Sequence, residues 1–391
     1  MELSVIRLVE DTIDEKDIGK LIKWLKTCPR LTKGPKTIEF EKAWAKYLGT
    51  KESVFVNSGS SANLVMLQVL LETGRIKKGD SVVVPALAWA TDLSPVVQLG
   101  LNPVLCDCNL EDLSVDLDHL EDLAYENPDI KAIMFVSVLG LVPNMDRLLQ
   151  ICNDHSIFLL EDSCESFGSQ YKGRNLGTFG LMSTFSTYFG HHLSTIEGGI
   201  LATNDVDIAA AARCIRNHGW DRDYPEEKRK ELREKWGVSE FDSLYTFYMH
   251  GFNVRSTDLQ AFIGIGQLDK ADDVNTKREA NFNLYQANIK NSYWKPVYRE
   301  DTFCSNFAYP VINPNRDKIV AELIKQKIEV RPMICRSMGV QPFYVKLYGK
   351  QQLKNADIVD KFGMYVPNHP SMTEEDIKKV CEIINRYSES K

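Results

Sequence analysis

The sequence has 391 residues, 43% of them hydrophobic and 26% charged, which is the composition of a folded globular protein with room for one large domain and one smaller one. Its formal net charge of -7 gives no electrostatic reason to expect nucleic acid as a partner. No uninterrupted apolar run approaches the roughly 18 residues of a membrane helix, and the N-terminus lacks a secretory signal pattern, so we expect a cytoplasmic protein that binds no membrane.

The nine cysteines are an odd number, scattered through apolar or ordinary segments. This distribution favours reduced, structural thiols. The close pair Cys106 and Cys108 raises the alternative of a metal site, but no second Cys or His pair with zinc spacing follows it. We therefore expect no metal.

After about residue 38 the pattern alternates amphipathic helices with short apolar strands, which is typical of an α/β fold with a mostly parallel sheet. Helices are expected over residues 38–48 and 62–71, and strands over 54–56, 81–84, 104–106, 132–136 and 157–160. Nearly every residue of these strands is apolar, as in a sheet covered by helices on both faces. Polar segments follow the strands, where α/β proteins bind ligands.

Towards the C-terminus the pattern changes. The charged run at residues 224–236 predicts a solvated helix, with a partner-binding face as the alternative. Beyond about residue 290 we expect a helix at 317–326, a strand at 328–330 and a closing helix at 374–387. This outline predicts an N-terminal segment with a large domain over residues 1–290 and a small C-terminal α/β domain over residues 291–391.

Three strand ends carry candidate ligand-binding residues. Small residues around Gly59, Ser60 and Ser61 join a strand to a helix start, where backbone N–H groups can face a phosphate; a simple N-cap is the alternative. Trp89 follows the strand at 81–84, where its ring can stack on a heteroaromatic cofactor, although a core tryptophan is commoner. Asp162 ends the strand at 157–160, where a carboxylate can bind a protonated pyridine nitrogen; a surface or capping acid is the alternative.

Together with the segment Gly-His-His-Leu-Ser-Thr-Ile-Glu-Gly-Gly at residues 190–199, these segments resemble the pyridoxal-phosphate sugar aminotransferases of the DegT/DnrJ/EryC1/StrS type. The resemblance covers nearly the whole chain and implies the aspartate aminotransferase fold (fold type I). It implies that serines hold the cofactor phosphate, that the tryptophan stacks on the ring, and that Asp162 pairs with its nitrogen. The cofactor-binding residues so implied are Gly59, Ser60, Ser61, Trp89, Asp162, Glu165, Ser186 and Asn253. Of these, Asn253 resembles the residue that reaches the phosphate of the neighbouring subunit, which implies a homodimer with shared active sites.

The sequence departs from the family at one position. Family members usually carry lysine seven residues before the first glycine of the Glu-Gly-Gly end, and counting back from Gly198 gives His191; His192 is the alternative. Residues 179–204 contain no lysine. A lysine amine can hold the cofactor covalently, whereas an imidazole only accepts or donates protons. The two histidines also raise a metal-ligand alternative, but no third ligand is evident.

Histidine at this position resembles the sugar 3-dehydratase branch of the family, which has two forms. One acts on a CDP-sugar and holds an iron-sulfur cluster, and the other acts on a GDP-sugar and uses glutamate without a cluster. A cluster needs four thiolates. Cys164 stands where the first could be, yet no cysteine occurs between Cys214 and Cys304. We therefore expect pyridoxal or pyridoxamine phosphate, not covalently attached, and no iron-sulfur cluster.

The resemblance implies removal of the C3 hydroxyl from a GDP-linked 4-keto-6-deoxy sugar, with L-glutamate as donor and 2-oxoglutarate and ammonia as products. His191 is the expected catalytic residue, since an unperturbed pKa of about 6.5 suits both proton removal and return. Arg331 is a candidate for binding a carboxylate or diphosphate, and His218 and Glu165 can line the sugar site. The alternatives are a CDP- or dTDP-linked substrate, or a binding protein without catalysis. A role in surface polysaccharide (O-antigen) synthesis follows from resemblance alone.

Overall fold

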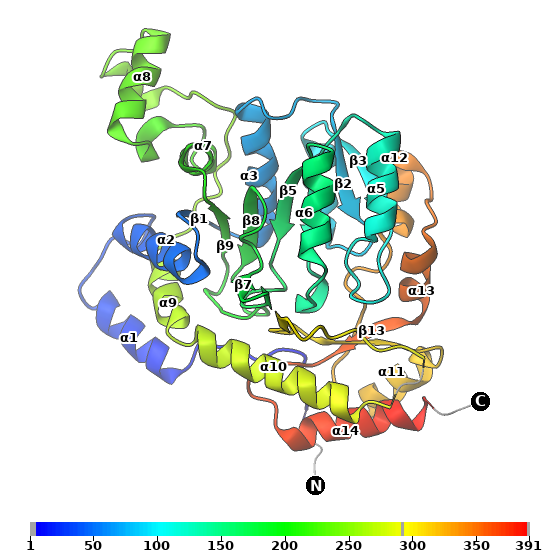
Figure 1. The fold of residues 1–391 in the computed structure, drawn as a ribbon. Helices are drawn as coiled ribbons and strands as arrows, with labels where there is room; N and C mark the ends of the chain where they lie inside the picture. Colours follow the sequence, from blue (N-terminus) through cyan, green and yellow to red (C-terminus); the bar gives the residue numbers. More distant parts are fainter. Residues whose placement is uncertain (1–4, 291–292, 389–391) are drawn as a thin grey trace.

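The protein is described by a computed structural model that covers residues 5–290 and 293–388. Its centre is a seven-stranded sheet in the order β1-β9-β8-β5-β4-β2-β3 (Figure 1). The strands are β1 Glu52–Val56, β2 Ser81–Pro85, β3 Asn102–Cys106, β4 Ile130–Val136, β5 Phe158–Asp162, β8 Met182–Ser186 and β9 Gly199–Thr203. Neighbours run parallel except at β9, which is antiparallel to both β1 and β8. The mostly parallel sheet predicted from the sequence is confirmed.

Five of these strands are the ones predicted from apolar runs, whereas β8 and β9 were not predicted; β8 carries Ser183 and Thr184 in its middle. Both side chains are buried. Ser183 Oγ donates to the Gly177 carbonyl at 2.6 Å, and Thr184 Oγ1 donates to Asn63 Oδ1 at 2.6 Å. A buried strand can hold such polar residues because each hydroxyl group has a partner.

Helices cover both faces of the sheet, since alternate side chains of a strand point to opposite sides. Val82 and Val84 pack with helices α3 (Gly59–Glu72), α4 (Ala90–Gln98) and α7 (Val206–Arg216). Val83 packs instead with α5 (Leu117–Glu126) and α6 (Met145–Asp154), which lie in front of the sheet in Figure 1. The helices expected at 38–48 and 62–71 are confirmed as α2 (Pro35–Leu48) and α3. Within the described residues, no helix combines the length and apolar character needed to span a membrane.

The carboxyl ends of β1, β2, β4, β5 and β8 meet along one edge of the sheet. Strands β1 and β8 share a direction because both are antiparallel to β9, and β8 is parallel to the remaining strands through β5. The segments after these strands are therefore neighbours in space although they are far apart in the sequence. This is the edge at which α/β proteins bind ligands.

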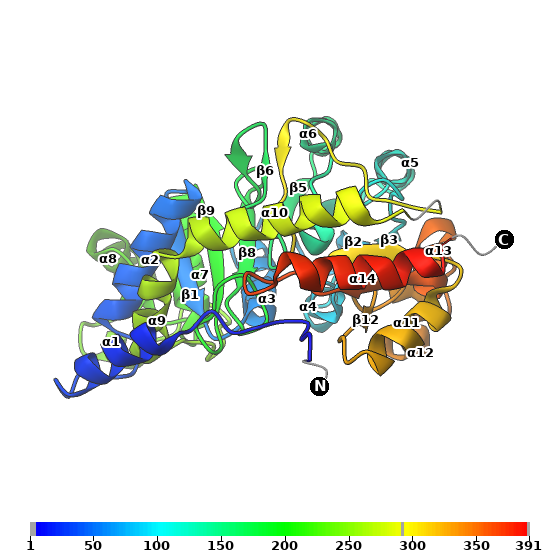
Figure 2. The same ribbon diagram turned by 90° about the horizontal axis from the view of Figure 1, so that it is seen from below.

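The C-terminal part packs beneath the sheet. Helix α10 (Ala271–Asn288) lies along α14 (Glu374–Arg386), as Figure 2 shows. A small sheet has the order β11-β13-β12, with strands Tyr309–Ile312, Gly363–Val366 and Arg331–Pro332. Other helices are α1 (Glu15–Leu25), α9 (Asp258–Leu268), α11 (Arg316–Lys325), α12 (Pro342–Tyr348) and α13 (Lys354–Phe362), and the short strands are β6 (Gln170–Tyr171), β7 (Arg174–Asn175) and β10 (Thr302–Phe303). The helices predicted at 317–326 and 374–387 are confirmed as α11 and α14.

The strand predicted at residues 328–330 is wrong. Ile328 forms only an isolated parallel bridge with Ile6 of the N-terminal segment, whose N–H donates to the Lys327 carbonyl at 3.0 Å. The regular strand of this region is β12, which begins at Arg331, directly after the predicted strand, and pairs with β13. The N-terminal segment therefore lies on the C-terminal part of the chain. The domain boundary expected after residue 290 falls on residues 291–292, outside the described residues.

Residues 219–251 form an arm that extends from the body (Figure 1). Its helix α8 (Glu226–Trp236) has no buried residue, which confirms the solvated helix predicted from the charged run. The base of the arm is held by a bridge between Asn217 and Asn253 and by the His218 N–H, which donates to the Phe252 carbonyl at 2.7 Å. The two ends of the arm are thus fixed to each other beside the main sheet.

Candidate active site

The turn between β1 and α3 forms a cradle of small residues. Ser58 is the N-cap of α3, and its side chain accepts a hydrogen bond from the Ser61 N–H at 3.1 Å. A Cβ on Gly59 would lie 2.8 Å from Ser186 Cβ and 3.0 Å from Cys164 Sγ, so glycine allows β5 and β8 to end against the helix. The first N–H groups of a helix have no partner within it and attract anions. The cradle fits a phosphate group.

The Glu-Gly-Gly end of the histidine segment packs against the cradle. Gly199 pairs with Val56 on one side and Ser186 on the other. A Cβ on Gly199 would lie 2.1 Å from the Ser58 carbonyl oxygen, so this close approach also requires glycine. Ser60, in the first turn of α3, is exposed, and its hydroxyl group is open to a ligand.

Asp162 ends β5 beside the cradle. Its Oδ2 accepts a hydrogen bond from Asn63 Nδ2 at 2.7 Å, and its Oδ1 accepts one from the Cys164 N–H at 2.9 Å. Only 6% of Asp162 is exposed, and no Lys or Arg in the described residues forms an ion pair with it. A buried carboxylate without a cation is costly. The protonated ring nitrogen of a bound pyridoxal cofactor would supply the missing positive charge.

Two further acids lie next to Asp162, and we call Asp92, Asp162 and Glu165 the acid cluster. Asp92 is 1% exposed, and its Oδ1 lies 3.4 Å from Asn63 Nδ2. Burial, with the adjacent Asp162 charge, raises the pKa of Asp92 well above its ordinary value. Glu165 accepts a hydrogen bond from the Leu139 N–H at 2.8 Å, and burial raises the pKa of Glu165 to about 7. The cluster retains protons that a carboxyl group in water would lose.

His191 faces the same group of residues. Its Nδ1 lies 2.8 Å from the Cys164 carbonyl oxygen. Because a carbonyl only accepts, Nδ1 carries the proton and Nε2 keeps a lone pair. Burial lowers the pKa of His191 to about 4, below the unperturbed value expected from the sequence. The imidazole is therefore neutral at pH 7 and is poised to act first as a base.

His192 occupies a different environment. It is 1% exposed, its Nε2 lies 2.9 Å from the Ser305 carbonyl oxygen, and its ring packs near Phe167 and Phe307. Adjacent residues point in different directions, so His192 belongs to the core while His191 faces the acid cluster. Within the described residues, no group of three or more His, Cys, Asp or Glu side chains is arranged to hold a metal ion.

Trp89 is the exposed aromatic residue of the site. It precedes α4 and is 55% exposed, so its ring is available for stacking. Its main-chain N–H donates to Asp92 Oδ2 at 3.0 Å. Cys335 from the C-terminal part donates its thiol to the Ala88 carbonyl at 2.6 Å. The C-terminal part therefore borders the site directly at the residue before Trp89.

Three of the predicted residues lie outside this group. Asn253 is exposed at the base of the arm and accepts a hydrogen bond from Arg255 Nε at 3.1 Å. His218 is exposed with φ 64°, and Arg331 is exposed on β12 opposite Tyr365. In the described part of the chain, no hydrogen bond or ion pair joins these three side chains to the acid cluster. Any role for them needs a bound ligand or a second subunit.

Sequence reasoning missed Asn63 and Asp92. Asn63 lies one turn after Gly59, and its amide contacts Asp162 while Thr184 fixes its carbonyl oxygen. Asp92 stands three residues after Trp89, and the spacing signals a helix start. That local signal accounts for the contact with the Trp89 N–H but not for the contact with β5, which only the fold creates.

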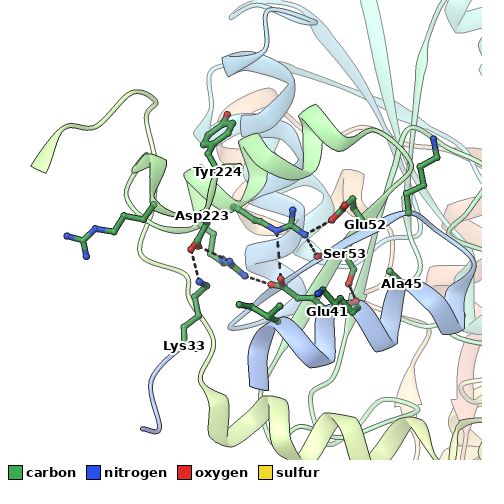
Figure 3. A pocket seen from close by; sticks show the side chains of 13 residues that line it. Lys33, Glu41, Ala45, Glu52, Ser53, Asp223 and Tyr224 are labelled. Carbon is green, nitrogen blue, oxygen red and sulfur yellow. Dashed lines mark hydrogen bonds and ion pairs between the residues drawn. The ribbon is translucent and has the colours of Figure 1, made fainter. Parts of the chain in front are cut away.

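A separate hollow lies between α2, β1 and α7 (Figure 3) and has a volume of about 570 Å³. We call it the charged hollow; its charged lining residues are Lys33, Glu41, Lys42, Lys51, Glu52, Arg213, Arg216, Arg222 and Asp223. Arg216 contacts Glu41 at 2.5 Å and Asp223 at 3.1 Å, and Arg213 contacts Glu52 at 2.6 Å. Its inner charges are neutralised within the protein, unlike those of the acid cluster.

The sheet, the cradle and the unpaired carboxylate at the end of β5 define a protein of the pyridoxal-phosphate aminotransferase fold. A solved structure of GDP-4-keto-6-deoxymannose-3-dehydratase with a trapped PLP-glutamate geminal diamine matches it with a TM-score of 0.88 and 31% identity, over 97% of this chain and all of that one. The chain belongs to the DegT/DnrJ/EryC1/StrS aminotransferase family, whose model matches residues 11–385.

Relatives of known name are similar over the whole length. GDP-4-keto-6-deoxy-D-mannose 3-dehydratase of Yersinia pseudotuberculosis is 33% identical over 389 residues, which is 97% of this chain and 98% of the relative. GDP-perosamine synthase of Caulobacter vibrioides is 30% identical, over 98% of this chain and 99% of the relative. The family and the fold predicted from the sequence are confirmed.

Proposed function

We propose that this chain is a pyridoxal-phosphate-dependent nucleotide-sugar 3-dehydratase. Its substrate is a GDP-linked 4-keto-6-deoxymannose, its donor is L-glutamate, and its product is the 4-keto-3,6-dideoxy sugar. The observation that carries the proposal is a neutral imidazole, His191, beside an acid cluster without a cation, in a segment without lysine. Relatives named as 3-dehydratases support the choice of reaction. The cytoplasmic location expected from the sequence stays a prediction.

The residues present fit the cofactor. The cradle offers N–H groups and the Ser60 hydroxyl to a phosphate, Asp162 offers a carboxylate to the ring nitrogen, and Trp89 offers an exposed ring for stacking. When bound, the cofactor supplies an electron sink for the negative charge that develops beside its amino nitrogen. The protein supplies the position, the counter-charge and the proton transfers.

His191 holds and moves the proton. With the cofactor bound, its Nε2 lone pair would accept a proton from the carbon next to the cofactor nitrogen, while Nδ1 keeps its hydrogen bond to the Cys164 carbonyl. Once protonated, the same nitrogen donates to the departing C3 hydroxyl of the sugar, which leaves as water. Loss of this oxygen reduces the sugar, and glutamate supplies the electrons. Glutamate is oxidised to 2-oxoglutarate, and its nitrogen is released as ammonia. Histidine, unlike lysine, forms no covalent link to the cofactor.

We also propose that two copies of the chain share their active sites. The arm exposes large apolar side chains, Phe241 at 81% and Tyr245 at 76%, with Phe247 also exposed, and such a patch favours burial against a partner. Asn253 lies exposed at the base of the same arm, where it is free to reach a second subunit.

The dimer is tested by the double substitution of Phe241 and Tyr245 by serine. We expect this variant to be monomeric in light scattering and to bind the cofactor more weakly in titration. A variant that stays dimeric with unchanged cofactor titration would overturn the proposal.

The reaction is tested by incubating the purified chain with pyridoxal phosphate, glutamate and GDP-4-keto-6-deoxymannose, and by following ammonia, 2-oxoglutarate and the sugar mass. We expect a sugar one oxygen lighter, with ammonia and 2-oxoglutarate in equal amounts. An amino sugar would contradict the role of His191. Parallel reactions with the CDP- and dTDP-linked sugars test the nucleotide, and faster turnover of either would replace GDP in the proposal.

A further inference from the structure

Asp92 makes contacts that the proposed reaction does not use. It lies in the first turn of α4 and is 1% exposed. Its carboxyl group lies beside that of Asp162, and its Oδ2 accepts a hydrogen bond from the main-chain N–H of Trp89 at 3.0 Å. Asn63 Nδ2 lies 2.7 Å from Asp162 Oδ2 and 3.4 Å from Asp92 Oδ1. One amide thus borders both carboxyl groups.

This geometry restricts where protons can be. Two buried carboxylates side by side repel each other and have no hydrogen to share, so either Asp92 or Asp162 keeps a proton, which can then bridge the pair. Asp162 already accepts from the Cys164 N–H and from Asn63, and both bonds stabilise its charged form. Asp92 accepts one main-chain hydrogen bond and a long contact to Asn63. The proton therefore belongs on Asp92, and the charge belongs on Asp162.

We propose that Asp92 is a positioning residue, which keeps its proton and donates it to Asp162, so that one fixed carboxylate faces the ring nitrogen of the cofactor. The proposal rests on the cofactor site described above. With Asp92 neutral, the pair carries one negative charge, which matches the single positive charge of a protonated pyridine. The hydrogen bond also holds the Asp162 carboxylate in one orientation, together with Asn63.

The other titratable groups around Asp92 favour the neutral form. Glu165 lies in the same cluster, and its charge acts on Asp92. The thiols of Cys164 and Cys335 lie near the Asp92 carboxyl group, and both stay neutral. Burial raises the pKa of Cys164 well above its ordinary value and that of Cys335 to about 12. Among the described residues, no Lys or Arg forms an ion pair with Asp92, so no adjacent cation favours its ionisation.

Two substitutions separate a hydrogen-bond donor from mere shape. Asp92→Asn keeps a donor towards Asp162 and cannot ionise, whereas Asp92→Leu keeps a branched side chain of similar shape and loses the donor. We expect Asp92→Asn to bind pyridoxal phosphate within about threefold of the unaltered chain, and Asp92→Leu to bind it about tenfold more weakly, which corresponds to one lost hydrogen bond to a charged group. The control is Asp112→Asn, because Asp112 is equally buried and contacts Ser114 instead of the site.

A direct readout does not depend on cofactor or activity. The infrared difference spectrum of the full chain minus Asp92→Asn at pH 7 should contain the carbonyl stretch of a protonated carboxyl group, and this band should shift in heavy water. A difference spectrum without that band would overturn the proposal, as would equal cofactor affinity in the asparagine and leucine variants. If the unaltered chain shows the band but binds no pyridoxal phosphate, the proposed function fails while the proton on Asp92 stands.

Discussion

The acid cluster and the charged hollow both bury carboxyl groups, but they balance charge in opposite ways. In the charged hollow, Glu41 is paired with Arg216 at 2.5 Å, and the ion pairs visible in Figure 3 link each inner acid to a base. In the acid cluster, Asp162 has hydrogen bonds but no cation. Burial alone therefore does not mark a functional site. The imbalance does, because it leaves room for a charged ligand.

Breaking the charge balance of the hollow should give the largest effect on stability. Arg216 is 1% exposed and contacts Glu41, Asp223 and the Phe55 carbonyl. Arg216→Met leaves Asp223 with Lys33 at 2.8 Å, but it leaves the buried Glu41 with only Arg213 at 3.8 Å. Because Glu41 loses its close cation, we expect the free energy of unfolding to fall by about 3 kcal/mol. Urea unfolding measures it. The control Lys42→Met, on the exposed rim, should change it by less than about 0.5 kcal/mol; equal losses would contradict the comparison.

Removing the carboxylate of the acid cluster should act on the cofactor instead. Asp162→Ala takes away the counter-charge of the ring nitrogen, so we expect the Kd of pyridoxal phosphate to rise about 100-fold, or about 2.7 kcal/mol, with no loss of stability in the protein without cofactor. Absorbance titration measures the affinity. The comparison would be broken if Asp162→Ala bound the cofactor normally, or if Arg216→Met weakened its binding as much.

Glu165 should give the acid cluster its own pH dependence. Its folded-state pKa of about 7 lies above the unfolded value of 4.5, so the folded state binds more protons between these values, and stability falls as the pH rises from 4.5 through 7. In the protein without cofactor, Glu165→Gln should remove about 1–3 kcal/mol of this loss. Thermal unfolding at pH 5 and pH 8 measures it; an unchanged pH dependence in the variant would show that Glu165 ionises normally.

Trp89 offers an exposed surface beside the acid cluster. The residue is 55% exposed, so Trp89→Ala costs little stability but removes the stacking surface. We expect cofactor affinity to fall about fivefold, equivalent to about 1 kcal/mol of aromatic stacking. Trp89→Phe is the matched control and should recover most of it. A fall in stability with unchanged affinity would mean that the ring serves the core.

Much of the fold follows from the apolar runs, since the strands at 81–84, 104–106, 132–136 and 157–160 and the helix at 374–387 are in place. The misses share a cause. The strand at 328–330 fails because its main chain pairs with Ile6, 322 positions away, and β8 is hidden because Thr184 meets a partner, Asn63, on another element. Local pattern does not contain contacts between distant segments.

The site follows the same rule. The places of Gly59, Asp162 and His191 beside one another could be predicted because each stands at a strand end or replaces a family residue in a short motif; their roles towards the cofactor stay predictions. Asp92 could not, because its role comes from the approach of α4 to β5. The lowered pKa of His191 could not either, since burial causes it. The roles of His218, Arg331 and Asn253 stay predictions.

The account depends above all on a cofactor held without a covalent bond beside His191. The most direct test is borohydride reduction of the chain loaded with pyridoxal phosphate, followed by intact mass spectrometry, for the unaltered chain and for His191→Lys. The account predicts an unaltered chain that gains no mass and a lysine variant that gains one cofactor per chain and loses dehydration. Stoichiometric addition of the cofactor to the unaltered chain would contradict it, because a lysine would then hold the cofactor after all.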